Sequence, residues 1–317
     1  MTPAIEARAL ARRFGEKDAV AGVDLTVAAG EIYGFLGPNG AGKSTTVRML
    51  TTLLKPTAGT ARVAGHDVAD EAEAVRLRIG VALQSAALDP KQTGRELLDL
   101  QGRLYGLSKH DRTARMNELL DLVGIGSAID QRIGTYSGGM KRRLDLAAAL
   151  VHQPEVLFLD EPTTGLDPTS RIAVWEEVRR LNKEVGMTIF LTTQYLEEAD
   201  TLADRVGIIA RGLLVAEDTP DALKRSIGSD VIVARVAPSA ADAVVAAVRD
   251  LAPVEGTEVS GHEVVISVAD GPAAISPVAV AIAQAGVRVE GLTLRTPTLD
   301  DVFLHITGGR LQEDEAA

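Results

Sequence analysis

The stretch Gly37-Pro38-Asn39-Gly40-Ala41-Gly42-Lys43-Ser44-Thr45 decides the fold of this chain. It matches the phosphate-binding pattern G-x-x-x-x-G-K-[ST] in full, between a strand predicted at Glu31–Leu36 and a helix predicted to start near Lys43. Glycines let the backbone wrap closely around phosphates, and the helix N-terminus adds partial positive charge. The Lys43 ammonium suits the β- and γ-phosphates, and the Ser44 hydroxyl suits Mg²⁺. The simpler alternative, a glycine-rich turn that only caps a helix, is disfavoured by the strand and helix on either side.

An acidic pair far along the chain supplies the expected partner of this loop. Val156–Leu159 is a short apolar run that predicts a buried strand, and Asp160 and Glu161 follow it directly. A carboxylate at the end of such a strand can contact Mg²⁺, directly or through water, so Asp160 is the candidate metal ligand. Glu161 is the candidate base that polarises the attacking water. Acidic pairs after strands are common, so this assignment depends on the complete phosphate loop upstream.

Short apolar runs alternate with longer amphipathic ones from Glu31 to about Val215. This alternation predicts an α/β fold, with a mostly parallel sheet and covering helices such as Ser170–Val185. Residues 93–136 show helical patterns, which predicts a helical subdomain inserted between strands of the sheet. The predicted strands are Glu31–Leu36, Ile79–Leu83, Val156–Leu159, Thr188–Thr192 and Val206–Ile209.

The pattern breaks near Arg225–Ser229, and a small α+β domain is predicted beyond it. We place the first domain at residues 1–226, the second at 227–310 and an acidic, solvated tail at 311–317. The order of apolar runs in the second domain predicts a βαββαβ arrangement without a catalytic cluster. Its strands are expected at Val231–Val236, Val254–Val259, Val264–Val268 and Val287–Leu294, and its helices at Ala240–Leu251 and Ala273–Ala285.

Composition excludes several classes of protein. The formal net charge of −11 argues against a nucleic-acid partner, because phosphate backbones are bound by basic surfaces. The absence of cysteine excludes disulfides, thiolate metal sites and cysteine nucleophiles. We find neither an apolar run of about eighteen residues nor a secretory signal, so we expect a cytoplasmic chain that does not cross the membrane itself.

The segment Tyr136-Ser137-Gly138-Gly139-Met140 distinguishes this chain from other proteins with a phosphate loop. It resembles the signature of the ATP-binding cassette of ABC transporters, which usually reads LSGGQ, with Tyr136 and Met140 replacing its ends. The resemblance extends from Phe14 to about Asp218, and it implies the P-loop NTPase fold of an ABC cassette. In that family this segment begins a helix that faces the γ-phosphate bound by the opposite subunit, a role that suits serine and glycine near an anion. The alternative is a serine that only caps a helix.

Three further residues resemble motif residues of the family, and they occur in the same order along the chain. Gln84, which ends the strand Ile79–Leu83, resembles the Q-loop glutamine that senses Mg²⁺ and the membrane partner. Asp167 resembles the D-loop aspartate that meets the other subunit's phosphate loop, and with Pro168 it also suits the start of a helix. Phe14 resembles the aromatic residue that stacks on adenine. The alternatives are a polar residue that closes a strand at Gln84 and an ordinary core residue at Phe14.

Gln194 departs from the family pattern. It follows the strand Thr188–Thr192, where the family usually has a histidine that touches the γ-phosphate. An amide can hydrogen-bond phosphate and water, but it cannot carry the charge or shuttle the proton of an imidazole. We therefore expect Gln194 to contact the γ-phosphate and Glu161 to act as the main base. A solvated loop residue is the alternative for Gln194.

Two segments resemble a narrower group, the daunorubicin/doxorubicin-resistance ATPases, in which glutamine also replaces the histidine. They are Gln194–Asp200 and the C-terminal stretch Thr296–Gly308. The resemblance implies an ATP-binding and hydrolysing subunit that powers efflux of a drug or other hydrophobic compound, and so antibiotic resistance, through a separate permease. ATPases for lipid or polysaccharide export have similar endings and remain an alternative.

The resemblance also implies the ligands and partners. ATP and Mg²⁺ would bind at composite sites, each joining the phosphate loop of one copy of the chain to Ser137–Gly139 of a second copy. The separate permease would dock around Gln84 and the helical subdomain, on the cytoplasmic side of the cell membrane. That permease would provide the chain's membrane contact.

Two other kinds of ABC ATPase are disfavoured. Translation-type soluble members have two cassettes in one chain, whereas this chain has one. DNA-repair types need a long coiled coil, for which the stretch between Lys43 and Ser137 is too short. Gln194 and the C-terminal ending favour an exporter over an importer, by resemblance.

Overall fold

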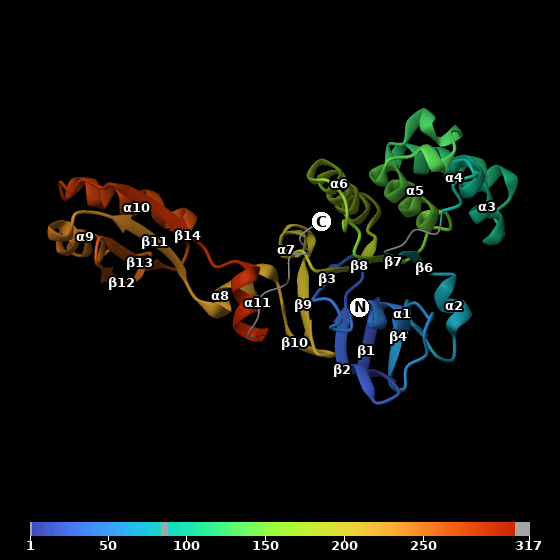
Figure 1. The fold of residues 1–317 in the computed structure, drawn as a ribbon, viewed down its shortest axis with the longest axis horizontal. Coiled ribbons are helices and arrows are strands. Elements are labelled where there is room, and N and C mark those ends of the chain that lie inside the picture. Colours follow the sequence, from blue (N-terminus) through green and yellow to red (C-terminus); the bar gives the residue numbers. More distant parts are fainter. Residues whose placement is uncertain (1, 84–87, 308–317) are drawn as a thin grey trace. The chain divides into compact units, whose positions relative to one another are not determined.

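The computed structural model describes residues 2–83 and 88–307. It divides into two compact units, one from Met1 to Pro220 and the other from Asp221 to Arg310 (Figure 1). The division precedes the expected boundary at residues 226 and 227, because most of helix α8 (Pro220–Ile227) groups with the second unit. Within the described ranges, no helix combines the length and the apolar character needed to span a bilayer.

The first unit begins with an antiparallel sheet that the sequence analysis did not anticipate. Strands β1 (Ile5–Phe14) and β2 (Lys17–Val27) form a hairpin, and β4 (Ala58–Val63) and β5 (His66–Asp67) extend the order to β2-β1-β4-β5. The register of β1 against β2 shifts between Ala7 and Leu10 and again between Arg12 and Arg13. Such irregularities break the two-residue alternation by which a half-buried strand is recognised in a sequence.

The second sheet of this unit holds the predicted parallel strands. Its order is β10-β9-β3-β8-β7-β6, and every pairing is parallel except that of β10 with β9. The strands are β3 (Ile32–Leu36), β6 (Ile79–Ala82), β7 (Val156–Asp160), β8 (Thr188–Thr193), β9 (Arg205–Ala210) and β10 (Leu213–Asp218). The prediction of a mostly parallel α/β sheet is confirmed, with ends shifted by a residue or so, whereas β10 was not predicted. The carboxyl ends of β3, β7 and β8 therefore meet at one edge.

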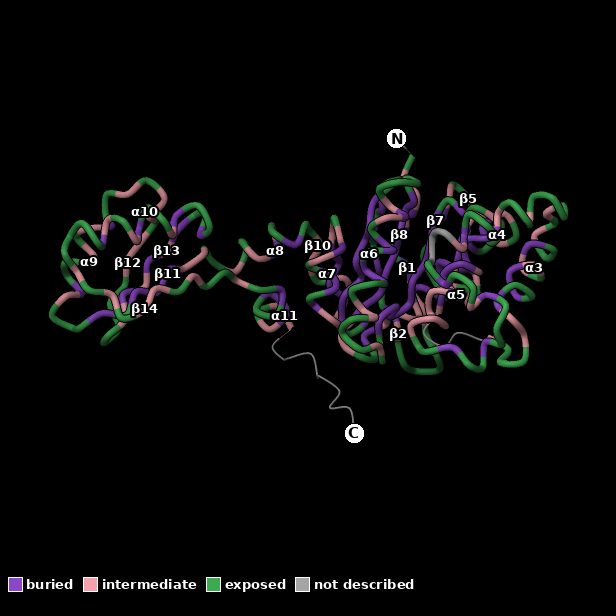
Figure 2. The backbone as a smooth tube through the Cα atoms, turned by 90° about the horizontal axis from the view of Figure 1, so that it is seen from above, coloured by how far each residue is buried: buried purple, intermediate pink, exposed green. Residues whose placement is uncertain are grey.

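Alternate residues of the central strands face two different cores. On β7, Val156 and Phe158 pack with the antiparallel sheet and α1 (Lys43–Leu50), whereas Leu157 and Leu159 pack with the helices on the other side. Figure 2 shows the buried residues following the central strands. All five residues of β7 are buried, which explains why the strand reads as a continuous apolar run.

Four helices of the first unit begin at side-chain caps. Residues 93–136 contain α3 (Gly94–Leu104), α4 (Lys109–Val123) and two short 3₁₀ turns, and α5 (Gly138–Leu150) follows. α2 (Ala72–Arg76), α6 (Pro168–Val185) and α7 (Leu196–Leu202) complete the unit. The side chains that accept from the first turn of α3, α4, α5 and α6 are Thr93, Ser108, Ser137 and Asp167.

The second unit has the predicted βαββαβ order in an antiparallel sheet, β12-β13-β11-β14. Its elements are β11 (Asp230–Arg235), α9 (Ala241–Val248), β12 (Val254–Ser260), β13 (Glu263–Val268), α10 (Gly271–Gln284), β14 (Gly291–Arg295) and α11 (Leu299–Thr307). The predicted start of the last strand at Val287 is wrong. β14 begins at Gly291, opposite Arg235, because β11 ends there and offers no earlier partner.

Candidate active site

The phosphate loop joins β3 to α1 in a conformation that depends on glycine. Gly42 has a φ of 114°, and a Cβ atom there would lie 2.6 Å from the carbonyl oxygen of Ala19. At Gly37, an added Cβ would lie 2.4 Å from the carbonyl oxygen of Ile209. Side chains at these two positions would therefore push the loop away from β2 and β9. The first turn of α1 begins at this loop, and its N–H groups, which lack helical partners, are available to an anion there.

Lys43 is nearly buried within this loop. Its Nζ atom donates to the carbonyl oxygen of Gly37 at 2.7 Å and to that of Pro38 at 3.3 Å, and it lies 3.4 Å from Oε1 of Glu161. Burial lowers the pKa of Lys43, and the negative charge of Glu161 opposes that shift. The ammonium is therefore held by the loop and by one acidic side chain, at the place where phosphate charge would enter.

Asp160 ends β7 beside the start of α1. Its Oδ1 atom accepts from the Ser44 hydroxyl at 3.3 Å and from the Thr192 hydroxyl at 2.5 Å. The Ser44 and Asp160 oxygens are hard donors of the kind that Mg²⁺ prefers. Among the described residues, no group of three or more acidic or histidine side chains is arranged for a metal. The donor set thus fits an ion that takes one carboxylate and one hydroxyl from protein and its other ligands from phosphate and water.

Glu161 adopts a backbone conformation that is unusual for its residue type. Its φ is 49°, in the left-handed region that side chains other than glycine, asparagine and aspartate rarely occupy. The Glu161 amide donates to both the carbonyl and the hydroxyl oxygen of Thr192, at 3.1 Å each. The carboxylate accepts from the Thr164 hydroxyl at 3.4 Å through Oε2. The fold therefore fixes this acidic side chain beside Lys43.

A pocket of about 280 Å³ opens over the phosphate loop. It is lined by Pro38–Gly40, Gly42–Thr45 and Glu161, and also by Lys17 and Ala19. The structure thus brings the predicted loop and the predicted base together in one space. Sequence reasoning missed Lys17 and Ala19, since both belong to β2, a strand of the sheet that was not anticipated.

Phe14 lies at the end of β1, three residues before Lys17. Phe14 is 48% exposed, and the guanidinium of Arg12 stacks over the ring at 4.7 Å from the centroid. The alternative of a core residue does not hold for Phe14, because about half of the residue is accessible. An exposed ring next to the pocket is compatible with stacking on a base.

Ser137 and Asp167 lie together on a different surface of the same unit. The Ser137 hydroxyl accepts from the Met140 amide at 3.2 Å, and Asp167 accepts from the amide and the hydroxyl of Ser170. A Cβ atom on Gly139 would lie 3.1 Å from the Ser170 hydroxyl oxygen. Ser137, Gly138 and Asp167 are exposed, and none of them lines the pocket over the phosphate loop.

Gln194 follows β8 directly and is half-buried. The residue before it, Thr193, accepts from the Gly37 amide through its carbonyl oxygen at 3.3 Å, so the β8 end touches the phosphate loop. Gln84, predicted to contact Mg²⁺, lies outside the described residues. Leu83, just before it, accepts from Arg142 of α5 through its carbonyl oxygen at 2.8 Å.

This fold, with a phosphate loop, an acidic strand end and a capped Ser-Gly-Gly helix, defines an ATP-binding cassette, a class of ATP hydrolases. The model of the ABC transporter family matches residues 20–164, and that of the C-terminal domain of DrrA1-3-like ATP-binding proteins matches residues 219–307. The chain belongs to the ABC transporter family, in the group of the daunorubicin/doxorubicin resistance ATP-binding proteins.

Relatives match over nearly the whole chain. The daunorubicin resistance ATP-binding protein DrrA3 of Streptomyces coeruleorubidus is 50% identical over 96% of both chains. The daunorubicin/doxorubicin resistance ATP-binding protein DrrA of Streptomyces peucetius is 47% identical over 97% of this chain and 93% of its own. A solved dimeric cassette in a post-hydrolysis state with ADP and phosphate is 25% identical, with a TM-score of 0.61 over 68% of this chain and 98% of its own.

Proposed function

We propose that this chain is the ATP-hydrolysing subunit of an exporter that expels a drug or other hydrophobic compound through a separate membrane permease. The observation that carries the proposal is the buried pairing of Lys43 with Glu161 beneath the pocket over the phosphate loop. The similarity to drug-resistance ATP-binding proteins over both units supports the choice of cargo.

ATP would bind first to the phosphate loop. The amides at the start of α1 and the Lys43 ammonium hold the β- and γ-phosphates, and the exposed ring of Phe14 stacks on the adenine. Ser44, Asp160 and Gln84 would hold Mg²⁺, which neutralises charge on the phosphate oxygens. Lys17 adds a second positive charge to the wall of the pocket.

Hydrolysis would depend on Glu161. Its carboxylate accepts a proton from the attacking water, whose oxygen then bonds to the γ-phosphorus as the bond to the leaving phosphate oxygen breaks. Gln194, an amide, donates to the γ-phosphate or orients the water and does not exchange protons. The left-handed backbone of Glu161 holds the carboxylate over the loop before ATP arrives.

The exposed surface that bears Ser137 and Asp167 fits a site that is shared with a second copy of the chain. Ser137, Gly138 and Asp167 do not line their own chain's pocket, yet they form an exposed, rigidly capped surface. In a twofold dimer, the start of α5 from one copy would face the γ-phosphate of the other. Binding of two ATP molecules would close this dimer, and loss of the γ-phosphates would reopen it.

The permease would dock around Gln84 and the helical subdomain. Two large apolar side chains of this subdomain, Leu100 and Leu104, are exposed on α3. They are four residues apart and so share one face of the helix, and an exposed apolar patch is a candidate protein contact. Contact with the permease would hold the chain at the cytoplasmic side of the membrane.

The test is Mg²⁺-dependent ATPase activity of the purified chain beside Glu161→Gln, with sedimentation in ATP. We expect the wild type to hydrolyse ATP, and the variant to bind ATP, stop turning over and sediment as a dimer. Normal turnover of a monomeric variant would overturn the mechanism.

Cargo is tested by drug accumulation in cells that express the chain with its permease. Unchanged drug accumulation together with altered surface lipid or polysaccharide would replace drug export by the alternative.

A further inference from the structure

Thr192 occupies a central position between the two acidic residues of the site. It pairs directly with Asp160 in the parallel register of β7 and β8, and its side chain is completely buried. Its hydroxyl has one hydrogen to donate and lone pairs to accept with. The hydrogen goes to Oδ1 of Asp160 at 2.5 Å, and the oxygen accepts from the Glu161 amide at 3.1 Å.

These two bonds fix both acidic residues from one point. The bond to Asp160 orients the carboxylate whose same oxygen accepts from the Ser44 hydroxyl at 3.3 Å. The bond from the Glu161 amide, together with that to the Thr192 carbonyl, stabilises a backbone with a φ of 49°. Such a conformation persists only where surrounding contacts over-determine it.

The carboxyl end of β8 contacts the phosphate loop and continues directly into Gln194. Thr193 accepts from the Gly37 amide through its carbonyl oxygen, and Gln194 is the next residue. Gln194 is two residues after Thr192. A displacement of Gln194 would therefore shift Thr192 and, through its hydrogen bonds, Asp160 and Glu161. A valine at position 192 would keep the shape of the side chain and remove this link.

We propose that Thr192 is a positioning residue that sets Asp160 and Glu161 for hydrolysis and couples them to the segment bearing Gln194. The proposal rests on the proposed function, since it assigns Thr192 a part in the same ATP hydrolysis. Thr192 acts through the two acidic residues and does not itself touch the nucleotide.

The test compares Thr192→Val with Thr192→Ser, which keeps the hydroxyl. Thr188→Val is the matched control, because Thr188 is buried on the same strand and its hydroxyl accepts from the Gly30 amide at the opposite end. We expect Thr192→Val to lower kcat about 10- to 100-fold, as a misplaced catalytic group does, with little change in KM. Thr192→Ser should recover most of the rate, and Thr188→Val should keep it.

A second measurement does not depend on turnover. ATP affinity is measured by titration with and without Mg²⁺, at a temperature where each variant is folded. We expect Thr192→Val to bind metal-free ATP like the wild type and to gain less affinity on addition of Mg²⁺, because Asp160 has lost its fixed orientation. Thr188→Val should show the wild-type gain.

The outcomes separate the two proposals. Wild-type turnover and a wild-type gain from Mg²⁺ in Thr192→Val, beside an inactive Glu161→Gln, would overturn the role of Thr192 and leave the proposed function standing. Equal losses in Thr192→Val and Thr188→Val would also overturn it, because they would indicate general damage to β8. Absence of hydrolysis in the wild type would instead remove the proposed function.

Discussion

The Nζ atom of Lys43 lies 3.4 Å from Oε1 of Glu161, and both side chains are less than a tenth exposed. The carboxylate compensates part of the cost of burying the lysine, whose pKa is lowered by that burial. An incoming γ-phosphate offers Lys43 a second anionic partner. We therefore expect nucleotide binding to loosen the hold of Lys43 on Glu161 and to leave the carboxylate available to a water molecule.

Removal of either member of this pair should be unfavourable in the nucleotide-free protein. We expect Lys43→Ala to lower the free energy of unfolding by about 3 kcal/mol, since it removes the buried cation that pairs with the Glu161 carboxylate. Adding Glu161→Gln to Lys43→Ala should restore part of that loss. Urea unfolding of the two single variants and the double variant measures the coupling. Strictly additive effects would mean that the two side chains do not interact.

Complementation tests whether Ser137 acts on the other copy of the chain. Lys43→Ala disables the phosphate loop, and Ser137→Arg blocks the approach of α5 to an anion, so each variant alone should be inactive. A mixed dimer retains one intact composite site. After equal mixing, half of the dimers are mixed, and each of these has one intact site of two. The ATPase rate should therefore recover to about a quarter of the wild-type rate. If sedimentation shows mixed dimers without activity, Ser137 serves its own chain.

Gln194 should contribute to hydrolysis without titrating. We expect Gln194→Ala to lower kcat about tenfold, through loss of one hydrogen bond to the γ-phosphate or water. Glu197→Ala is the control, because Glu197 is exposed in the first turn of α7. ATPase assays over a range of pH should show the same profile shape in Gln194→Ala and wild type. An unchanged rate in Gln194→Ala would leave Gln194 as a solvated loop residue.

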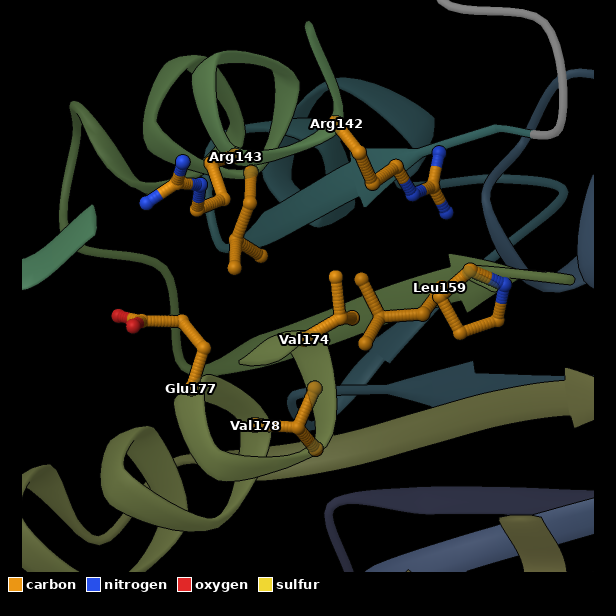
Figure 3. A pocket seen from close by; sticks show the side chains of 8 residues that line it. Arg142, Arg143, Leu159, Val174, Glu177 and Val178 are labelled. Carbon is orange, nitrogen blue, oxygen red and sulfur yellow. The ribbon is translucent and has the colours of Figure 1, made fainter. Parts of the chain in front are cut away.

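The contact between α5 and α6 should make stability depend on pH. Glu177 borders a small apolar cavity lined by Leu146, Leu159 and Val174, and Figure 3 shows Arg143 on the same side of it. Burial raises the pKa of Glu177 to about 7, against the attraction of Arg180 and Arg143.

Because this folded-state pKa lies above that of an unfolded glutamate, the stabilisation is complete at low pH and is lost as pH rises towards 7. Glu177→Gln should therefore stabilise the protein above neutral pH, by about 1 kcal/mol once screening by solvent is allowed for. The gain should disappear near pH 4, just below the ordinary glutamate pKa of about 4.3, because Glu177 is then protonated in both the folded and the unfolded protein. Denaturant unfolding at both pH values measures it, with the exposed Glu176→Gln as control. A gain of equal size at both pH values would contradict the assignment.

Several features of the fold could be predicted because each depends on neighbours in sequence. The phosphate loop needs its glycines and Lys43 at fixed spacing, and buried parallel strands such as β7 have continuous apolar runs. Asp160 and Glu161 were predicted to act together with the loop, because they directly follow a buried apolar strand and the phosphate loop upstream is complete. The antiparallel sheet escaped prediction, because its bulged strands lack a regular alternation.

The sequence by itself determined the class of this protein, through the phosphate loop, the acidic strand end and the Ser137-Gly138-Gly139 segment. Only the tertiary structure decided which other groups meet the site. Lys17 lines the pocket because β2 lies beside the phosphate loop, and Thr192 holds the acidic pair because it stands opposite Asp160 in register. Both depend on pairings between distant segments, and a local pattern holds no information about which strands become neighbours or in which register they pair.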